Sequence, residues 1–191
     1  MRPLVRAFAL LALALPGLAC LTPGADGPAG EPVGSFVFEA QLEANECGAA
    51  AVPAMDPFTY RAELRRDEGM AIWRRPDAPV VYGTIDTEDT WTLSTTTTIP
   101  VWEPDPTTGD PGCALDQTET LSFRVVEGEG SPDAATTQAT RVEGGTQEIR
   151  FIPSIGTNCS AALRVTGGPF DTLPCSVRYT FDAEPTAPLF D

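Results

Sequence analysis

The side chains of this sequence that could do chemistry are carboxylates, hydroxyls and arginines, because the chain contains neither histidine nor lysine. Without an imidazole, a serine or cysteine nucleophile has no histidine base, and a metal site has no histidine ligand. Without a lysine amine, Schiff-base chemistry and Walker-type phosphate binding are excluded as well. We find no cofactor motif, and therefore expect no cofactor and no catalytic residue.

Two acidic segments are candidates for a metal ion. Asp86-Thr87-Glu88-Asp89 is the densest acidic run, and residues 103–110 carry three more carboxylates between prolines. Calcium prefers several oxygen ligands, but neither segment has the D-x-[DN]-x-[DN]-G spacing of a calcium loop. We therefore predict no metal site and interpret both segments as solvated turns.

A pair of carboxylates could in principle hydrolyse glycosides, one as acid and one as nucleophile. The acidic residues on the expected strands, however, alternate with apolar ones, as Glu39, Glu43 and Glu63 do. This pattern is typical of the solvated face of a strand. A carboxylate-dependent hydrolase acting on envelope glycans is therefore the alternative, and a non-enzymatic role is the prediction.

The tryptophans offer one candidate binding residue. Trp73 and Trp91 are in phase with apolar neighbours, which predicts packing in the core. Trp102 is out of phase with Trp91 and follows Pro100-Val101 at the end of an expected strand. It is thus either a cap on the edge of the core or an exposed ring that contacts a sugar or a protein partner.

The charge balance restricts the partners. Twelve arginines stand against 27 acidic residues, giving a formal net charge of −15. A chain this acidic is repelled by nucleic acid, so we exclude nucleic acid as a partner. The basic doublets Arg65-Arg66 and Arg74-Arg75 are expected to pair with acids on the face of a sheet.

Strand-like alternation recurs at short intervals after residue 34, and no stretch of eleven residues keeps a helical period. With 23 threonines and 42% hydrophobic residues, the chain suits half-solvated antiparallel sheets around one core. We predict an all-β domain over residues 35–191, an antiparallel β-sandwich with a small β-barrel as the alternative. The expected strands lie at 36–42, 58–65, 70–74, 80–82, 91–99, 121–125, 149–151, 163–165 and 177–181, with a hairpin turn at Asp67-Glu68-Gly69 and long loops at 103–112 and 127–139.

The first residues have the organisation of a secretory signal peptide. Arg2 and Arg6 precede an unbroken apolar run of nine residues, Ala7 to Leu15, which is too short to cross a bilayer as a helix. Pro16-Gly17 then ends the run. We therefore assign residues 1–19 to a signal peptide.

Gly17-Leu18-Ala19-Cys20 resembles the lipobox of bacterial membrane lipoproteins, although Gly17 stands where that family usually has leucine. The resemblance implies that Cys20 begins the mature chain and carries the lipid. Residues 20–34 are then a Pro/Gly-rich tether from the membrane. Leu21 stands where aspartate would retain a lipoprotein at the inner membrane of enteric bacteria, so the expected location is the outer membrane. Cleavage after Ala19 by an ordinary signal peptidase, leading to secretion, is the alternative.

Cysteine counting supports lipidation. With Cys20 acylated, four cysteines remain, an even number that can form two disulfides in an oxidising compartment: Cys47, Cys113, Cys159 and Cys175. The expected strand count places Cys175 at the opposite end of the sheet from the other three, so no pairing satisfies it fully. We favour Cys47–Cys113 with Cys159–Cys175. A zinc site of four thiolates lacks the paired C-x₂₋₄-C spacing.

The sequence thus indicates a lipid-anchored protein of the cell envelope with a binding, interaction or structural role. The expected partners are the membrane, through the lipid, and an envelope protein or glycan.

Overall fold

A computed structural model describes residues 30–76, 78–127 and 139–190 of the chain. The predicted signal peptide, the lipidation site Cys20, most of the tether and the interior of the expected loop 127–139 lie outside these residues. None of the helices in the described part has the length and apolar character needed to span a membrane.

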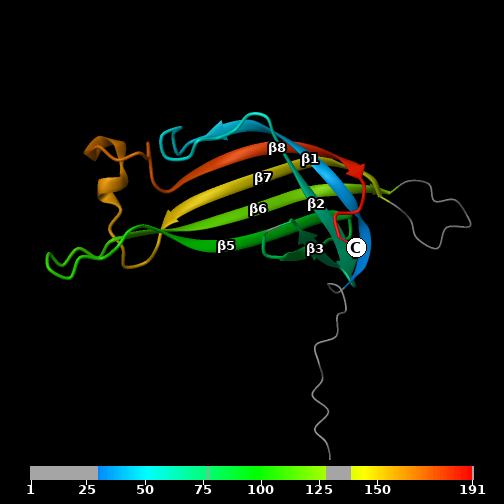
Figure 1. Ribbon diagram of the computed structural model, residues 1–191, viewed down its shortest axis with the longest axis horizontal. Coiled ribbons are helices and arrows are strands. Elements are labelled where there is room, and N and C mark those ends of the chain that lie inside the picture. Colours follow the sequence, from blue (N-terminus) through cyan, green and yellow to red (C-terminus); the bar gives the residue numbers. More distant parts are fainter. Residues whose placement is uncertain (1–29, 77, 128–138, 191) are drawn as a thin grey trace, which may run out of the picture.

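The described residues form a closed barrel of eight antiparallel strands, in which each strand pairs with the next and β1 also pairs with β8 (Figure 1). The strands are β1 (Glu31–Asn45), β2 (Phe58–Asp67), β3 (Met70–Arg74), β4 (Val81–Ile85), β5 (Thr90–Trp102), β6 (Cys113–Glu127), β7 (Ala139–Pro153) and β8 (Cys175–Thr186). The all-β class is confirmed. The predicted β-sandwich is wrong, and the alternative, a small β-barrel, is the fold. Ten residue pairs, from Ser35↔Thr186 to Asn45↔Val177, join the first strand to the last and close the sheet.

The barrel is closed over only part of its length. β2, β3 and β4 have 10, 5 and 5 residues, whereas the other strands have 12 to 15. We call the end that holds Glu31 and Thr186 the base, and the opposite end the far end. Beyond the short strands, β5, β6, β7, β8 and β1 continue towards the far end as a curved sheet (Figure 1).

Aromatic side chains fill the closed part. Phe38 is fully buried and its ring centroid lies 4.7 Å from that of Trp73 and 5.5 Å from that of Phe181. Phe123 contacts both Trp73 and Trp91. The predicted core positions of Trp73 and Trp91 are confirmed, since they are 1% and 2% exposed. An eight-stranded barrel has an interior just wide enough for such filling.

Local turn chemistry explains the hairpins. The predicted turn between β2 and β3 is confirmed: Glu68 and Gly69 both have positive φ, 46° and 87°, as a two-residue type I′ connection requires. Residues 103–112 form the predicted loop between β5 and β6. The strand expected at 163–165 is wrong, because Ser160–Ala162 and Arg164–Thr166 are short 3₁₀ turns and Leu163 between them forms an isolated bridge with Phe170.

The start of β1 differs from the composition-based boundary. Glu31 is already in the strand, so the boundary drawn between residues 34 and 35 lies four residues late. Pro32 and Gly34 pair with Arg65 and Leu64 on either side of a β-bulge. A bulge on a strand accepts the proline and glycine that composition alone assigns to a tether.

The disulfides are Cys47–Cys175 and Cys113–Cys159, so the favoured pairing Cys47–Cys113 with Cys159–Cys175 is wrong. Because residues 163–165 form no strand, the chain does not cross the barrel between Cys159 and Cys175. All four cysteines therefore lie at the far end. There one bridge joins the segment that follows β1 to the start of β8, and the other joins the start of β6 to the segment that follows β7.

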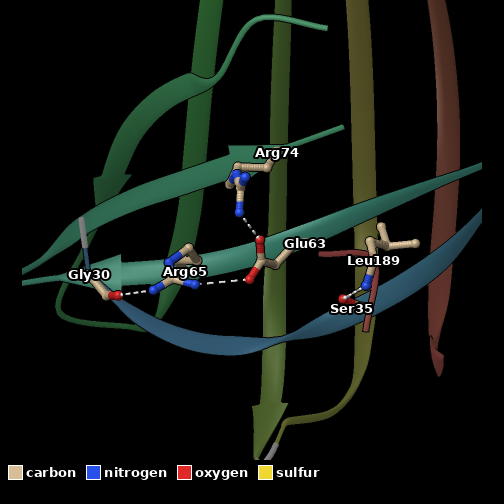
Figure 2. Close-up of polar contacts among 6 residues, drawn as sticks. All are labelled: Gly30, Ser35, Glu63, Arg65, Arg74 and Leu189. Atoms are coloured by element: carbon tan, nitrogen blue, oxygen red, sulfur yellow. Dashed lines mark hydrogen bonds and ion pairs between the residues drawn. The ribbon is translucent and has the colours of Figure 1, made fainter. Parts of the chain in front are cut away.

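A polar network covers the outer wall of β1, β2 and β3 near the base (Figure 2). The Glu63 carboxylate accepts hydrogen bonds from Arg65 Nη1 at 3.0 Å and from Arg74 Nη1 at 2.7 Å. The second terminal nitrogen of Arg65, Nη2, donates to the Gly30 carbonyl at 2.6 Å. The residues after β8 lie over this wall. Leu189 N donates to Ser35 Oγ at 3.2 Å, and the Arg74 guanidinium lies 3.8 Å from the centroid of the Phe190 ring.

The predicted solvated face is therefore wrong for Glu63, which is only 8% exposed. The expected pairing of the arginine doublets is confirmed for Arg65 and Arg74 on this wall, and Arg66 pairs with Glu127 at the base. Arg75 pairs on the inside of the barrel instead.

Replacing Glu63 by alanine leaves Arg65 and Arg74 without their shared carboxylate. Breaking a fully buried ion pair costs about 3–5 kcal/mol. Because the two arginine side chains remain 17% and 19% exposed, we expect a loss of roughly 2 kcal/mol in the free energy of unfolding, measured in urea. The control Glu148→Ala, on an exposed residue of β7, should change it by less than about 0.5 kcal/mol. Equal losses for the two variants would contradict this role of Glu63.

Removing each disulfide separately should distinguish their contributions. Cys47–Cys175 spans 128 residues and Cys113–Cys159 spans 46. Chain entropy then predicts losses of about 5 and about 4 kcal/mol for the Cys→Ser double variants. Thermal or urea unfolding of the two double variants measures these losses in the free energy of unfolding. A larger loss for the Cys113 and Cys159 variant than for the Cys47 and Cys175 variant would contradict the prediction.

Candidate ligand-binding site at the barrel mouth

The closed barrel ends where β3 stops at Arg74 and β4 starts at Val81. We call this level the mouth. On β5, Leu93 is the last residue that pairs with β4, and from Ser94 onward β5 pairs only with β6. The aromatic core lies on the base side of the mouth, and the inner face of the curved sheet lies on the other side.

Four polar side chains gather at the mouth, and we call them the mouth cluster: Tyr60 of β2, Arg75 after β3, Glu119 of β6 and Gln147 of β7. Glu119 has the same inward phase as the buried residues Leu121 and Phe123. Gln147 is 4% exposed, and the Glu119 side chain is 12% exposed. Charged and amide groups thus occupy positions that alternation assigns to the core.

Glu119 is the centre of the cluster. Gln147 Nε2 donates to Glu119 Oε1 at 2.7 Å, and Arg75 Nη2 lies 3.6 Å from Glu119 Oε2. A carboxylate only accepts hydrogen bonds, so the amide of Gln147 must turn its nitrogen towards Glu119 and its oxygen away. The positive charge of Arg75 offsets the negative charge of Glu119, which leaves the cluster neutral.

The cluster also holds polar atoms that have no hydrogen-bond partner. In the described part of the chain, three buried side-chain atoms are unpartnered, and all three belong to the mouth cluster: Tyr60 Oη, Arg75 Nε and Gln147 Oε1. Burying such an atom without a partner costs about 1–3 kcal/mol, and native structures contain few. Three such atoms at one level of the barrel can hydrogen-bond to water or to a ligand, which makes the mouth the candidate binding site.

The protonation state of Tyr60 follows from its surroundings. Burial raises the pKa of the Tyr60 phenol, the nearby Glu119 raises it further, and Arg75 opposes both. The phenol therefore stays protonated at neutral pH and can donate a hydrogen bond. Together with Arg75 Nε–H it presents two donors, while Gln147 Oε1 presents an acceptor.

Aromatic rings adjoin these polar atoms. The Tyr60 ring stacks on Phe38, with 5.1 Å between centroids and 6° between planes, and on Phe58 at 5.5 Å. Phe58 in turn meets Tyr179 edge-on at 4.9 Å. A few converging polar groups beside apolar and aromatic surface are the usual composition of a small-molecule site.

Trp102, the binding residue predicted from the sequence, does not belong to this cluster. It lies at the far end of β5, opposite Cys113, and is half-buried against the core. Seven residues separate it from Thr95, the partner of Glu119 on β5, which corresponds to about 23 Å along a strand. The structure thus places Trp102 on a different part of the molecule from the mouth cluster.

The acidic turns use their carboxylates internally. Asp86 Oδ1 accepts hydrogen bonds from the backbone N–H groups of Thr90 and Glu88. These two hydrogen bonds lower the pKa of Asp86, the one from Thr90 most. Asp105 Oδ1 accepts from the hydroxyl and N–H of Thr107, which lower the pKa of Asp105 likewise. Within the described residues, no group of three or more Cys, Asp or Glu side chains is arranged to hold a metal ion.

Two of the acids considered for hydrolysis lie on the outer wall of the barrel. Glu63 is held by two arginines, as described above. Glu39 pairs with Asp182 across β1 and β8, and both line an outer groove of about 380 Å³ beside Gly144 and Gly145. Glu39 and Asp182 are solvent-exposed, whereas a general acid in a glycosidase depends on a water-excluded environment. The groove therefore gives no support to the hydrolase alternative.

The mouth cluster was not predicted from the sequence, although β6 carries a signal for it. Gln117 and Glu119 interrupt an apolar phase that runs from Leu115 to Leu121 and Phe123. Polar residues in the inward phase of a strand predict a polar interior at that level. Arg75 gives no such signal, because it follows the end of a short strand.

Comparisons with protein-family models, with curated proteins and with solved structures find no match to this chain.

Proposed function

We propose that this chain is a non-enzymatic binding protein, anchored to the cell envelope by lipid on Cys20, and that its mouth cluster holds an uncharged ligand bearing hydroxyl or amide groups. The observation that carries the proposal is that the three buried side-chain atoms without a partner among the described residues all lie at the mouth. The proposal rests on the chemistry of this site and not on the fold, because proteins with the same fold have many different functions.

The cluster's charge and hydrogen-bonding pattern select the class of ligand. An ionic ligand would meet the opposite charges of Glu119 and Arg75 together, so neither sign is favoured. A hydroxyl group accepts from Tyr60 or Arg75 and donates to Gln147, and an amide does the same through its two ends. The ring of Tyr60 adds an aromatic face on which an apolar ring surface can pack. A neutral sugar meets all three requirements, in keeping with the glycan partner expected from the sequence.

The envelope location rests on the N-terminal segment and on the cysteines. Disulfides persist in oxidising compartments, so Cys47–Cys175 and Cys113–Cys159 support a location outside the cytoplasm. The lipobox-like segment supports an anchor, and the residue after Cys20 favours the outer membrane. Secretion without lipid is the alternative.

Replacing Tyr60 by phenylalanine tests the binding site through two opposite effects. Because the Tyr60 hydroxyl is buried without a partner, its removal should raise the free energy of unfolding by about 1 kcal/mol. The same change should weaken ligand binding about threefold to tenfold, since one neutral hydrogen bond contributes about 0.5–1.5 kcal/mol. Urea unfolding measures the first effect. Calorimetric titration of the protein with neutral mono- and disaccharides, and with uronic acids and amino sugars as charged counterparts, measures the second.

Glu148→Gln on the outer face of β7 is the control and should change neither quantity. Native mass spectrometry of the protein purified from its own envelope adds an assay that needs no chosen ligand. We expect the wild-type protein to retain a small molecule that the Tyr60→Phe and Gln147→Met variants lose. A destabilised Tyr60→Phe variant with unchanged ligand retention would reject the site.

Replacing Cys20 by serine tests the anchor. The variant should leave the membrane fraction and appear in the soluble periplasmic or extracellular fraction, because no acyl chain remains to hold it. Mass spectrometry of the wild-type protein should find lipid on Cys20 and no free thiol among the four other cysteines. A Cys20→Ser protein that remains membrane-bound after a salt wash would contradict lipid anchoring.

A further inference from the structure

The curved sheet beyond the mouth has two edges, and they differ in whether a loop covers them. On the β1 edge, residues 46–57 fold back over the strand. Asp56 Oδ1 accepts the N–H of Leu42 at 3.1 Å, and Asn45 Nδ2 donates to the Val52 carbonyl at 2.9 Å. The β1 edge is thus covered by the chain's own loop.

Among the described residues, none covers the β5 edge in this way. β4 pairs with β5 only at Trp91, Thr92 and Leu93. From Ser94 to Val101 every residue is exposed or half-exposed, and within the described part of the chain these residues form no backbone hydrogen bond outside the ladder with β6. One side of this segment therefore presents free N–H and C=O groups, the arrangement that accepts another strand.

The composition of this edge differs from that of edges protected against pairing. Natural edges carry lysines, inward-pointing charges or strong bulges. β5 has no charged residue from Thr90 to Trp102, and residues 95–99 are all β-branched. Pro100, which lacks an N–H, and the bulge between Pro100 and Trp102 end the regular edge. Ser94 to Ile99 is the stretch that remains available.

We propose that this β5 edge, Ser94 to Ile99, pairs antiparallel with the same edge of a second copy of the chain. Self-complementarity selects this occupant. A net charge of −15 makes copies repel one another over most of their surface. The β5 edge is free of charged residues, so two copies can meet along it without placing like charges opposite each other. An antiparallel pair of identical strands is a two-fold interface, and Thr95 to Thr98 places threonine opposite threonine or its close neighbours, which is a favourable cross-strand pair.

Native mass spectrometry of the full chain purified from its own envelope measures the oligomeric state directly. We expect a dimer for the wild-type protein. Thr96→Lys puts a charge on the edge of each copy and should raise the dissociation constant at least tenfold. Thr118→Lys is the matched control: Thr118 lies opposite Thr96 on the same outer face, but its strand is paired on both sides. This variant should remain a dimer.

Amide hydrogen exchange on the wild-type protein gives a readout that requires no variant. Protection of Ser94 to Ile99 should increase with protein concentration, while the β7 ladder should be unaffected. A wild-type protein that is monomeric at all concentrations would overturn the proposal, as would a dimer equally resistant to Thr96→Lys and Thr118→Lys. Concentration-independent protection of the edge in a monomer would mean that another part of the same chain covers it, and would also reject self-pairing.

Discussion

Hydrogen bonding between β1 and β8 closes the sheet on itself, and the other features of the structure depend on that closure. The two strands are separated by nearly the whole domain in sequence, yet ten residue pairs join them. Closure directs one side chain of every two into a shared interior. The aromatic core occupies that interior on the base side of the mouth. Cys47–Cys175 joins the segment that follows β1 to the start of β8 at the far end, so a covalent bond supports the pairing that closes the barrel.

The outer wall and the mouth show two opposite solutions to burying charge. On the wall, Glu63 accepts from two arginines, and Arg65 uses a second nitrogen on the Gly30 carbonyl. Inside the mouth, Glu119 is also met by an arginine and an amide, but three neighbouring atoms are left without partners. The first arrangement stabilises the fold. The second retains an energetic cost at one place, as is common where a protein keeps groups ready for a ligand.

The sequence was informative where local chemistry decides the structure. Alternation identified most strands, the positive φ of Glu68 and Gly69 follows from the turn residues, and the tryptophan phases predicted Trp73 and Trp91 in the core. Closure could not be predicted, because a sandwich and a barrel share the same alternation and differ only in which edges pair. The disulfide pairing failed for a related reason: the alternation at Leu163 to Val165 predicts a strand, but Leu163 forms an isolated bridge and Arg164 and Val165 lie in a 3₁₀ turn. The mouth cluster depends on Tyr60 and Arg75 meeting Glu119 across the barrel, which no local pattern encodes.

The place where the chain enters the barrel determines which way the molecule faces. β1 begins at Glu31 at the base, close to where β8 ends, and runs from there to the far end (Figure 1). An attachment through the N-terminus would therefore join the barrel at its base. The disulfide-linked loops and the inner face of the curved sheet then point away from the point of attachment. If the N-terminus is the point of attachment, as proposed for Cys20, the open end of the barrel faces away from the membrane, and a ligand reaches the mouth from the side opposite the attachment.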